Sequence, residues 1–431
     1  MKVISIVVRV LAAASITAPV LHGQTLNTIY SFGHNELGYK PTSGVVVGLD
    51  RALYGTTPSG GGSGLGVVYK LVPPSSPGGE WAQVVIHSFS SSNGDGPPTM
   101  GVGLALGPSG ALYGVTTYND VGDFGTVFQL KPSGGDSLWG EGVLHAFTDK
   151  NGDGSGPATT PLFGPQSVLY GATTVGGTTG SGVVYGLVAP GPQGGTWTEN
   201  IAYNFDPTMG DGWGPAGALA INGDGTIYGT TQGGGAIGLG TAFQLAPPAA
   251  AGGSWTETLL HSFGSYTNPH DPGIPNGLVL GAGGVLYGTA EGGSGSCFEP
   301  CGSVFELSPP QAPGGAWTET ILHYFTGGDH TVDGTQPNSS PVLGPNGELY
   351  GTTRGGGRHD GGIIYEMVPP ASPGGSWTEI ILYSFTNLAD GGIPNAVTLG
   401  PDGNLYGTTA FGGVSKDGAT NQGTVFQLVL Q

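Results

Sequence analysis

Histidine is the side chain of this sequence best suited to acid–base chemistry or metal binding near neutral pH. Four of the nine histidines share one position of an internal repeat, which tyrosine fills elsewhere: His87, His145, His261 and His323 alternate with Tyr30, Tyr203 and Tyr383. A position that accepts either ring favours a structural role for a flat ring with a polar tip. The histidines free for chemistry are those in predicted loops: His34, His270, His330 and His359.

Three predicted loops, around positions 270, 330 and 354–360, form the candidate ligand-binding site. The last of them carries the only basic cluster of a chain with 10 basic and 29 acidic residues. The candidate residues are Arg354, Arg358, His359, His330, His270, Asp271 and Asp333. A lyase would need a base and a group that neutralises charge, which a histidine and two arginines provide, although no catalytic residue is assigned. Sequence drift in exposed loops is the structural alternative.

An aspartate recurs just before the first strand of six repeats: Asp95, Asp153, Asp211, Asp271, Asp333 and Asp390. Each one caps its own turn in the structural interpretation, whereas a ring of carboxylates for a cation or sugar hydroxyls is the functional one. Asp149, Asn151 and Asp153 also match the first half of a calcium-binding loop, although Thr160 stands where the bidentate acid belongs. The sequence predicts no cofactor, with Ca²⁺ at these three residues as the alternative.

The two cysteines, Cys297 and Cys301, are close together in the sequence. In an exported chain this spacing favours a local disulfide that pins one loop. A metal site would normally need two more ligands close by.

A repeat of 56 to 63 residues sets the elements that must position these side chains. A segment close to Leu-Tyr-Gly-Thr-Thr recurs seven times, with its tyrosine at Tyr54, Tyr113, Tyr170, Tyr228, Tyr287, Tyr350 and Tyr406. Around each tyrosine come a strand after proline, the tyrosine strand, a strand such as 423–428 and a strand such as 255–263. Such β-branched and aromatic runs, bounded by Gly and Pro and without helical periodicity, predict β-strands.

Four antiparallel strands per repeat predict an all-β fold, a seven-bladed β-propeller of four-stranded antiparallel blades. After the first 23 residues the chain opens with a lone fourth strand at 28–32, and it finishes with a third strand at 423–431. We therefore expect the N-terminal strand to close the last blade. A solenoid is the structural alternative, but its terminal repeats would differ from the others.

Residues 1–23 are interpreted as a signal peptide and residues 24–431 as the propeller. Lys2, a mostly apolar run and a small residue before Gln24 are typical of an exported chain. The formal net charge of −19 disfavours nucleic acid and anionic membrane surfaces as partners. No later segment is apolar enough to span a bilayer, so we expect no membrane insertion after the signal is removed.

The repeat Gly-x-Leu-Tyr-Gly-Thr-Thr, followed by Gly-Gly and by Gly-Thr-Val-Phe-x-Leu, resembles the gloeo/verruco (GloVer) repeat family of exported bacterial proteins. The match is close at residues 347–353 and 403–409 and covers essentially the whole chain after the leader. The resemblance implies a β-propeller and export, but no particular activity. Family members often carry an anchor segment after the propeller. Here the sequence ends directly after its last strand, which favours free secretion into the periplasm or the medium.

We expect a monomeric binding or scaffold module without catalysis, whose loops hold a carbohydrate or a cell-surface protein. The alternative is an extracellular lyase or hydrolase that acts on a polysaccharide or a small metabolite at the loops of the fifth and sixth blades. No nucleophile elbow, phosphate loop, zinc-helix motif or dinucleotide fingerprint supports a familiar enzyme class. A glycosidase stays open, because its paired carboxylates would come from different blades.

Overall fold

The computed structural model describes residues 24–76, 78–90, 96–117, 124–132, 139–191, 193–250, 252–264, 273–292, 301–312, 314–327, 332–372 and 374–430. They form an all-β structure with short 3-10 turns: η2 (Pro108–Gly110), η3 (Pro165–Ser167), η4 (Pro207–Met209) and η5 (Ala282–Gly284). None of the described residues belongs to a helix with the length and apolar character needed to cross a membrane. The signal peptide predicted at 1–23 lies outside the described residues.

The strands come in groups of four along the chain. The first strands, two of them in two pieces, are β2 (Val46–Val47), β6 (Ala105–Leu106), β10 (Gly154–Pro157) with β11 (Leu162–Phe163), β15 (Gly212–Ile221), β19 (Gly273–Leu280), β23 (Gly334–Pro337) with β24 (Val342–Leu343), and β28 (Gly392–Leu399). The second strands carry the Leu-Tyr-Gly repeat and are β3 (Leu53–Thr57), β7 (Leu112–Thr116), β12 (Leu169–Gly176), β16 (Ile227–Gly234), β20 (Leu286–Gly292), β25 (Leu349–Gly356) and β29 (Leu405–Phe411).

The remaining strands complete each group. The third strands are β4 (Val67–Val72), β8 (Thr126–Lys131), β13 (Val183–Val188), β17 (Thr241–Ala246), β21 (Ser303–Ser308), β26 (Ile363–Val368) and β30 (Thr424–Val429). The fourth strands are β5 (Ala82–Ser88), β9 (Gly140–Ala146), β14 (Thr198–Asn204), β18 (Thr256–Ser262), β22 (Thr318–Tyr324), β27 (Thr378–Ser384) and, from the start of the chain, β1 (Thr25–Ser31).

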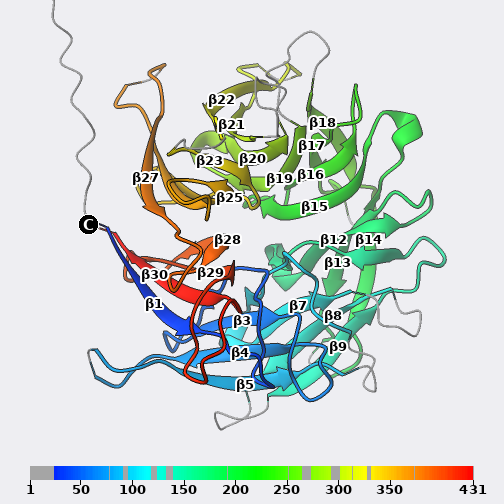
Figure 1. Cartoon of the computed structure of the whole chain (residues 1–431). Helices are drawn as coiled ribbons and strands as arrows, with labels where there is room; N and C mark the ends of the chain where they lie inside the picture. The colour runs from blue at the N-terminus through cyan, green and yellow to red at the C-terminus, as the bar shows by residue number, and fades with distance from the viewer. Residues whose placement is uncertain are drawn as a thin grey trace, which may run out of the picture.

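Hydrogen bonds join these strands into antiparallel sheets arranged as in a β-propeller. First strands of neighbouring groups contact one another, as β2 contacts β6 and β24 contacts β28. Fourth strands such as β1, β5 and β9 lie at the outer edge (Figure 1). Two groups share one eight-stranded sheet, in which β15 and β19 are linked in parallel at Ala218 and Gly277.

The glycine of the Leu-Tyr-Gly repeat is dictated by an aromatic ring on the third strand. A Cβ atom on Gly55 would lie 2.3 Å from the Tyr69 hydroxyl, and one on Gly114 would lie 2.5 Å from Phe128 Cζ. Both approaches are too close for any side chain other than hydrogen. The repeat therefore leaves room on the second strand for the ring that the third strand supplies.

Aromatic pairs, edge-to-face or tilted, join each group of strands to the next. A phenylalanine directly after a fourth strand packs against a ring in the third strand of the following group, with ring centroids 5.0–5.5 Å apart. The pairs are Phe32–Tyr69, Phe89–Phe128, Phe147–Tyr185, Phe205–Phe243, Phe263–Phe305, Phe325–Tyr365 and Phe385–Phe426. All of these side chains are buried. Such pairs contribute about 0.5–1.5 kcal/mol each beyond the burial of their area.

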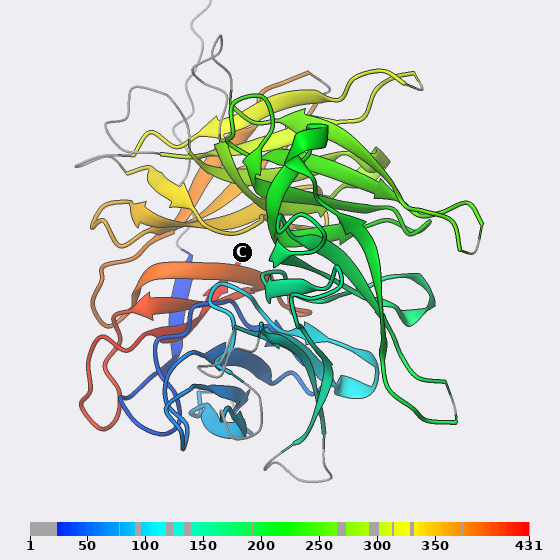
Figure 2. The ribbon, with the colours of Figure 1, turned by 90° about the vertical axis from the view of Figure 1, so that its right-hand side faces the viewer.

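The two ends of the described chain meet in one sheet. β1 pairs antiparallel with β30 over residues 25–31 and 424–429, which confirms the predicted pairing of the termini. Figures 1 and 2 show this first strand, in blue, beside the red end of the chain. The segment after β1 then contacts the last group, where Asn395 Nδ2 donates a hydrogen bond of 3.0 Å to the Pro41 carbonyl. The sheets therefore form a closed ring.

Deletion of residues 24–33 removes β1 together with the buried Phe32. We expect the free energy of unfolding to fall by at least about 3 kcal/mol, the usual cost of removing a buried phenylalanine. The bare edge of β30 should also promote aggregation. Urea unfolding and sedimentation velocity measure the two effects, with a chain that lacks only residues 1–23 as the control. Equal unfolding midpoints for the two proteins would contradict a ring held closed by β1.

Candidate functional site

Two sets of connections meet at one end of the ring and form a surface that we call the loop face. They run from a fourth strand to the next first strand, and from a second strand to a third strand. Backbone hydrogen bonds tie the two sets together: Gly177 N donates to Asp153 O at 2.7 Å, Gly357 N to Asp333 O at 2.8 Å, and Gly413 N to Leu388 O at 2.7 Å. The loops that the sequence predicts to share a face therefore do so here.

Three of the candidate ligand-binding residues are exposed: Arg354, which lies on β25 and not in the predicted loop, and Arg358 and His359, which lie on the connection from β25 to β26. The Arg358 N–H donates to Ser384 Oγ at 2.8 Å, which fixes the backbone of this connection to the end of β27. Asp333 lies beside it on the same face, through the bond from Gly357. The other candidates, His330, His270 and Asp271, lie outside the described residues, so their part in a site stays a prediction.

Arg354 also interacts with an acid of the preceding group. Burial of Glu291, at the end of β20, raises the pKa of its carboxyl group, and the positive charge of Arg354 opposes this effect only in part. This pair could not be predicted from the sequence, because the two residues belong to different repeats. A partly buried carboxyl group with a raised pKa, close to a guanidinium group, is a candidate for proton transfer.

The recurring aspartates are bound as turn caps where the structure describes them. Asp333 accepts hydrogen bonds from the Thr326 N–H and hydroxyl, both at 2.7 Å, and Asp153 accepts the same two bonds from Thr148. Burial opposes ionisation of Asp333, but the hydrogen bonds from His323 and Thr326 hold its pKa below the usual range. These contacts favour the structural interpretation of the repeat aspartate. Two of its members, Asp95 and Asp271, lie outside the described residues.

The predicted calcium loop forms a tight turn. Asp149 and Asn151 both have positive φ angles, 53° and 57°. Both carboxylate oxygens of Asp153 accept hydrogen bonds from nearby residues. The metal-ligating side chains that do gather around Asp153 are His145 and Glu199. Calcium at Asp149, Asn151 and Asp153 stays a prediction.

Cys301 is buried just before β21 and packs in the hydrophobic cluster between this group and the next. Its predicted partner, Cys297, lies outside the described residues. The disulfide between them therefore stays a prediction.

A glutamate that recurs on the fourth strand, and that is not among the predicted site residues, contacts the histidine on the fourth strand of the preceding group. His145 Nε2 lies 3.5 Å from a carboxylate oxygen of Glu199, and His323 Nε2 lies 3.5 Å from one of Glu379. These glutamates belong to a Trp-x-Glu segment that recurs five times in the sequence. That recurrence was the available signal, but the contact itself joins consecutive repeats and appears only in the folded ring.

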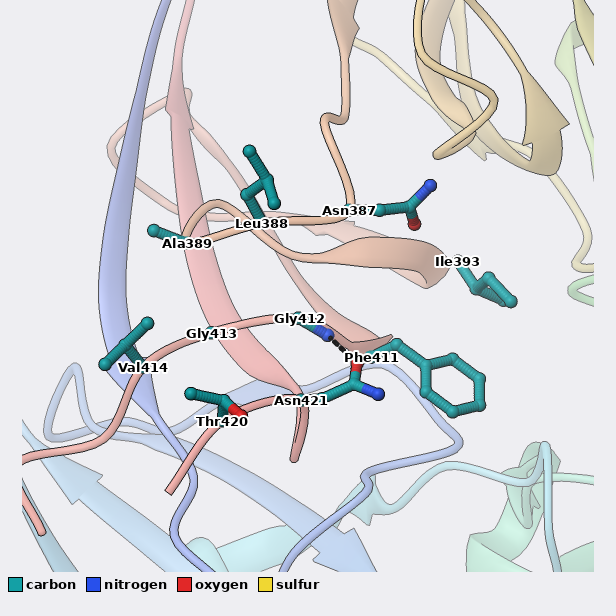
Figure 3. A pocket seen from close by; sticks show the side chains of 10 residues that line it. All are labelled: Asn387, Leu388, Ala389, Ile393, Phe411, Gly412, Gly413, Val414, Thr420 and Asn421. Atoms are coloured by element: carbon teal, nitrogen blue, oxygen red, sulfur yellow. Dashed lines mark hydrogen bonds between the residues drawn. The ribbon is translucent and has the colours of Figure 1, made fainter. Parts of the chain in front are cut away.

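An apolar groove of about 800 Å³ opens on the loop face of the last group. Figure 3 shows its two walls, the connection from β27 to β28 and the connection from β29 to β30. Its apolar side chains include Leu388, Val414 and Phe411, which are 71%, 56% and 37% exposed. Asn387 and Asn421 add amide groups to the lining. An apolar surface with a few polar groups is typical of a ligand site.

Ile393 enters this groove from a strained backbone. Its φ angle is 52°, in the left-handed region where a β-branched residue is a rare outlier. The Ile393 N–H donates to Gly361 O at 3.0 Å, so the neighbouring group holds the residue in place. Figure 3 shows Ile393 and Phe411 at the same end of the groove. The residue before the first-strand proline has a positive φ in other groups too, as in Lys40 (55°), Ile274 (59°) and Gln336 (58°), so this conformation belongs to the repeat and not to the groove alone.

Cationic groups border the groove. Lys40 Nζ lies 5.8 Å from the centre of the Phe411 ring. Asn387 Nδ2, on the groove wall, donates to the His359 carbonyl at 3.4 Å. The connection that carries His359 and Arg358 therefore adjoins the groove. None of these contacts was predicted from the sequence, which placed the basic cluster on the loop face without the groove.

Two overlapping stretches, residues 139–328 and 274–431, match the pattern of the Gloeobacter/Verrucomicrobia repeat. The chain belongs to this repeat family. The matched residues include the groove and the basic cluster at 354–360, and they confirm the resemblance seen in the sequence. No curated protein matches this Gloeobacter/Verrucomicrobia repeat protein.

Several solved structures resemble this member of the repeat family. A PQQ-bound aldose sugar dehydrogenase from Streptomyces coelicolor is 15% identical, with a TM-score of 0.42, over 94% of this chain and 98% of that chain. A gluconolactonase from Xanthomonas campestris is 11% identical, with a TM-score of 0.41, over 95% and 91%. Drosophila semaphorin 1a, extracellular domains 1–2, is 11% identical, with a TM-score of 0.47, over 94% and 88%. Likeness at this level assigns no ligand and no reaction to the chain.

Glu257 makes the stability of the ring depend on pH. Burial and the nearby Asp211 raise the pKa of Glu257 from 4.5 to about 7 in the folded protein. Between these values the folded state binds a proton that the unfolded chain does not, so stability rises as the pH falls from about 7 to 4.5. As the pH falls over this interval, we expect the melting temperature of wild type to rise by roughly 1–2 °C more than that of Glu257→Gln, which has no carboxylate to protonate.

Thermal unfolding of wild type and Glu257→Gln across this interval measures the difference. Glu36→Gln, which removes the same charge from an exposed loop, is the control and should follow wild type. Identical pH profiles for all three proteins would show that Glu257 ionises normally in the folded state.

Proposed function

We propose that this protein is an exported, non-enzymatic binding module whose loop-face groove holds an acidic carbohydrate. The observation that carries the proposal is an exposed aromatic groove bordered by cations in a chain of net charge −19. A sugar ring offers an apolar face to Phe411 and hydroxyl groups to Asn387 and Asn421. The carboxylate of a uronate would pair with Arg358 or Lys40.

The scaffold in this proposal is a ring of seven blades, one for each repeat. Seven separate hydrophobic clusters support this number, because each is built from two consecutive groups of strands. One cluster combines Phe32 and Tyr406 of the last group with Tyr69 of the first, as a closed circle requires. The eight-stranded sheet counts as two blades, since only Ala218 and Gly277 join its halves. A closed ring of this kind presents its loops on a rigid support.

The surrounding charge favours an anionic ligand at this groove. Two lysines elsewhere on the molecule are paired with acids, Lys70 with Asp50 at 3.0 Å and Lys416 with Glu80 at 2.5 Å. Within the part of the chain that the structure describes, no carboxylate lies within ion-pair distance of Arg358 or Lys40. A cationic border in an otherwise acidic molecule attracts an anionic ligand, and the acidic surfaces elsewhere on the molecule do not compete for that ligand. The leader at 1–23 supports the periplasm or the medium as the place of binding.

A lyase or hydrolase is the second candidate, and the pair of Glu291 and Arg354 favours it. A lyase needs a base that removes a proton and a cation that stabilises the negative charge that develops. Burial raises the pKa of Glu291, which makes its carboxylate a stronger base, and Arg354 supplies the cation. Incubation with polyuronate, followed by measurement of new chain ends, distinguishes this candidate from binding alone.

Replacement of Phe411 by Ala should weaken binding of short galacturonate or guluronate oligomers about tenfold, because the stacking surface is lost. Isothermal titration calorimetry with these oligomers measures the effect. Trp213→Ala is the matched control, since Trp213 is an aromatic side chain, 47% exposed, on β15 of another group. Weaker binding in Trp213→Ala with unchanged binding in Phe411→Ala would move the site away from the groove.

The double substitution Arg354→Ala with Arg358→Ala should leave stability within about 0.5 kcal/mol of wild type, because both side chains are exposed. It should abolish measurable binding of the uronate oligomers and spare any binding of neutral galactose oligomers. Lys131→Ala, which removes an exposed cation at the end of β8, is the control. Unchanged uronate affinity in the double variant would assign the cluster to sequence drift.

A further inference from the structure

Two clusters of one histidine, one aspartate and one glutamate lie at junctions between groups of strands, away from the groove. In the first, His145 Nε2 is 3.2 Å from Asp153 Oδ1 and 3.5 Å from Glu199 Oε1. In the second, the same residue types recur, with His323 Nε2 at 3.3 Å from Asp333 Oδ1 and 3.5 Å from Glu379 Oε2. In each cluster the three ligand atoms lie within 4.8 Å of one another.

The electrostatics of these clusters call for a cation. Two carboxylates and a histidine share each space, and their side chains are only 11–22% exposed. A protonated histidine neutralises one carboxylate, and the second has no counter-charge once the pH exceeds the pKa of the glutamate, which burial raises to about 7 in Glu199 and Glu379. One oxygen of the glutamate, Oε1 in both Glu199 and Glu379, is completely buried and accepts no hydrogen bond. In Glu199 this is the oxygen that faces the histidine, whereas in Glu379 the other oxygen, Oε2, faces it. In both, a buried acceptor without a donor is a position where a partner is missing.

We propose that each cluster binds one divalent transition-metal ion of the zinc and manganese class. Imidazole nitrogen together with carboxylate oxygen is a ligand set for these ions, whereas calcium and magnesium take oxygen ligands. Ligand atoms that each lie about 2.1 Å from a metal are about 3.0–3.5 Å apart, which matches the separations between the histidine nitrogen and the two acids. Three protein ligands leave a position for water.

The surroundings of each cluster hold the ligands in place. The second oxygen of Asp153 accepts hydrogen bonds from Thr148, and that of Asp333 accepts them from Thr326, so each aspartate presents its first oxygen to the histidine. The glutamate comes from the following group of strands, on β14 in one case and on β27 in the other. Each ion would therefore link two neighbouring groups, where the aromatic junction already holds them.

A third junction provides an internal comparison. There Tyr203 takes the place of the histidine and donates a hydrogen bond of 2.6 Å to Asp211, with Glu257 nearby. The two acids are the same as in the histidine clusters. The tyrosine ring, however, has no nitrogen that could bind a metal, and its hydroxyl group donates a hydrogen bond to the aspartate. Since the fold accepts tyrosine at this position, a substitution of histidine by tyrosine removes the metal ligand with little change in packing.

Titration calorimetry with Zn²⁺, on the full mature chain freed of metal, tests the proposal. We expect the stoichiometry to fall by two equivalents from wild type to the double variant His145→Tyr with His323→Tyr. The reverse substitution, Tyr203→His, should add one equivalent, because Asp211 and Glu257 are already in place. Difference measurements of this kind cancel weak binding by exposed histidines, and neither result depends on carbohydrate binding.

Two controls keep the outcome decisive. Without metal, the double variant should melt at the wild-type temperature, and Zn²⁺ should raise the melting temperature of wild type more than that of the variant. If the tyrosine variant does not fold, Glu199→Gln with Glu379→Gln, which keeps the side-chain size, replaces it and should likewise lose two equivalents. Unchanged zinc stoichiometry in the folded variant would overturn the proposal and leave both clusters as hydrogen-bonded joints.

Discussion

The aromatic contact across each junction is the interaction on which the rest of the structure depends. The third-strand ring, such as Tyr69, leaves no space for a Cβ atom on the adjacent second strand, which fixes Gly55. The same ring receives the phenylalanine of the preceding group, Phe32, at 5.3 Å between centroids. One ring therefore determines both the packing of strands within a sheet and the spacing between sheets. A protein with few charges and many glycines relies on such contacts, because its loops contribute little apolar burial.

The aromatic contact at each junction also sets the position of the histidine or tyrosine of the repeat, near the loop face. The histidine or tyrosine of the repeat stands two residues before the junction phenylalanine, so both side chains project from the same side of the fourth strand. His145 packs edge-on against Phe147 at 4.7 Å, and Tyr203 packs against Phe205 at 5.2 Å. Histidine and tyrosine fit this geometry equally well, which explains their exchange along the sequence. They differ only in the polar atom that they bring to the neighbouring acids.

The architecture could be predicted from the sequence because every repeat carries the same local information. The second-strand tyrosines mark each group of strands, and the split last group, with its fourth strand at 25–31, follows from a count of strands at the two termini. The polar clusters could not be predicted in this way. Glu199 lies 54 residues after His145 in the numbering, and only the packing of consecutive groups shows that the two side chains meet.

The groove, unlike the aromatic junctions, is not repeated around the ring. It depends on residues that differ from the repeat in the last group, where the ring closes. Phe411 stands where three other repeats have a glycine, Gly233, Gly292 and Gly355, and this difference was visible in the sequence. The partner of Phe411 was not visible, because Lys40 arrives from the other end of the chain. Its backbone N–H donates to Gln422 O at 2.8 Å, and its ammonium group lies near the Phe411 ring. The groove itself is lined by residues of the last group alone, but the cation beside Phe411 is supplied only when the start of the chain closes the ring.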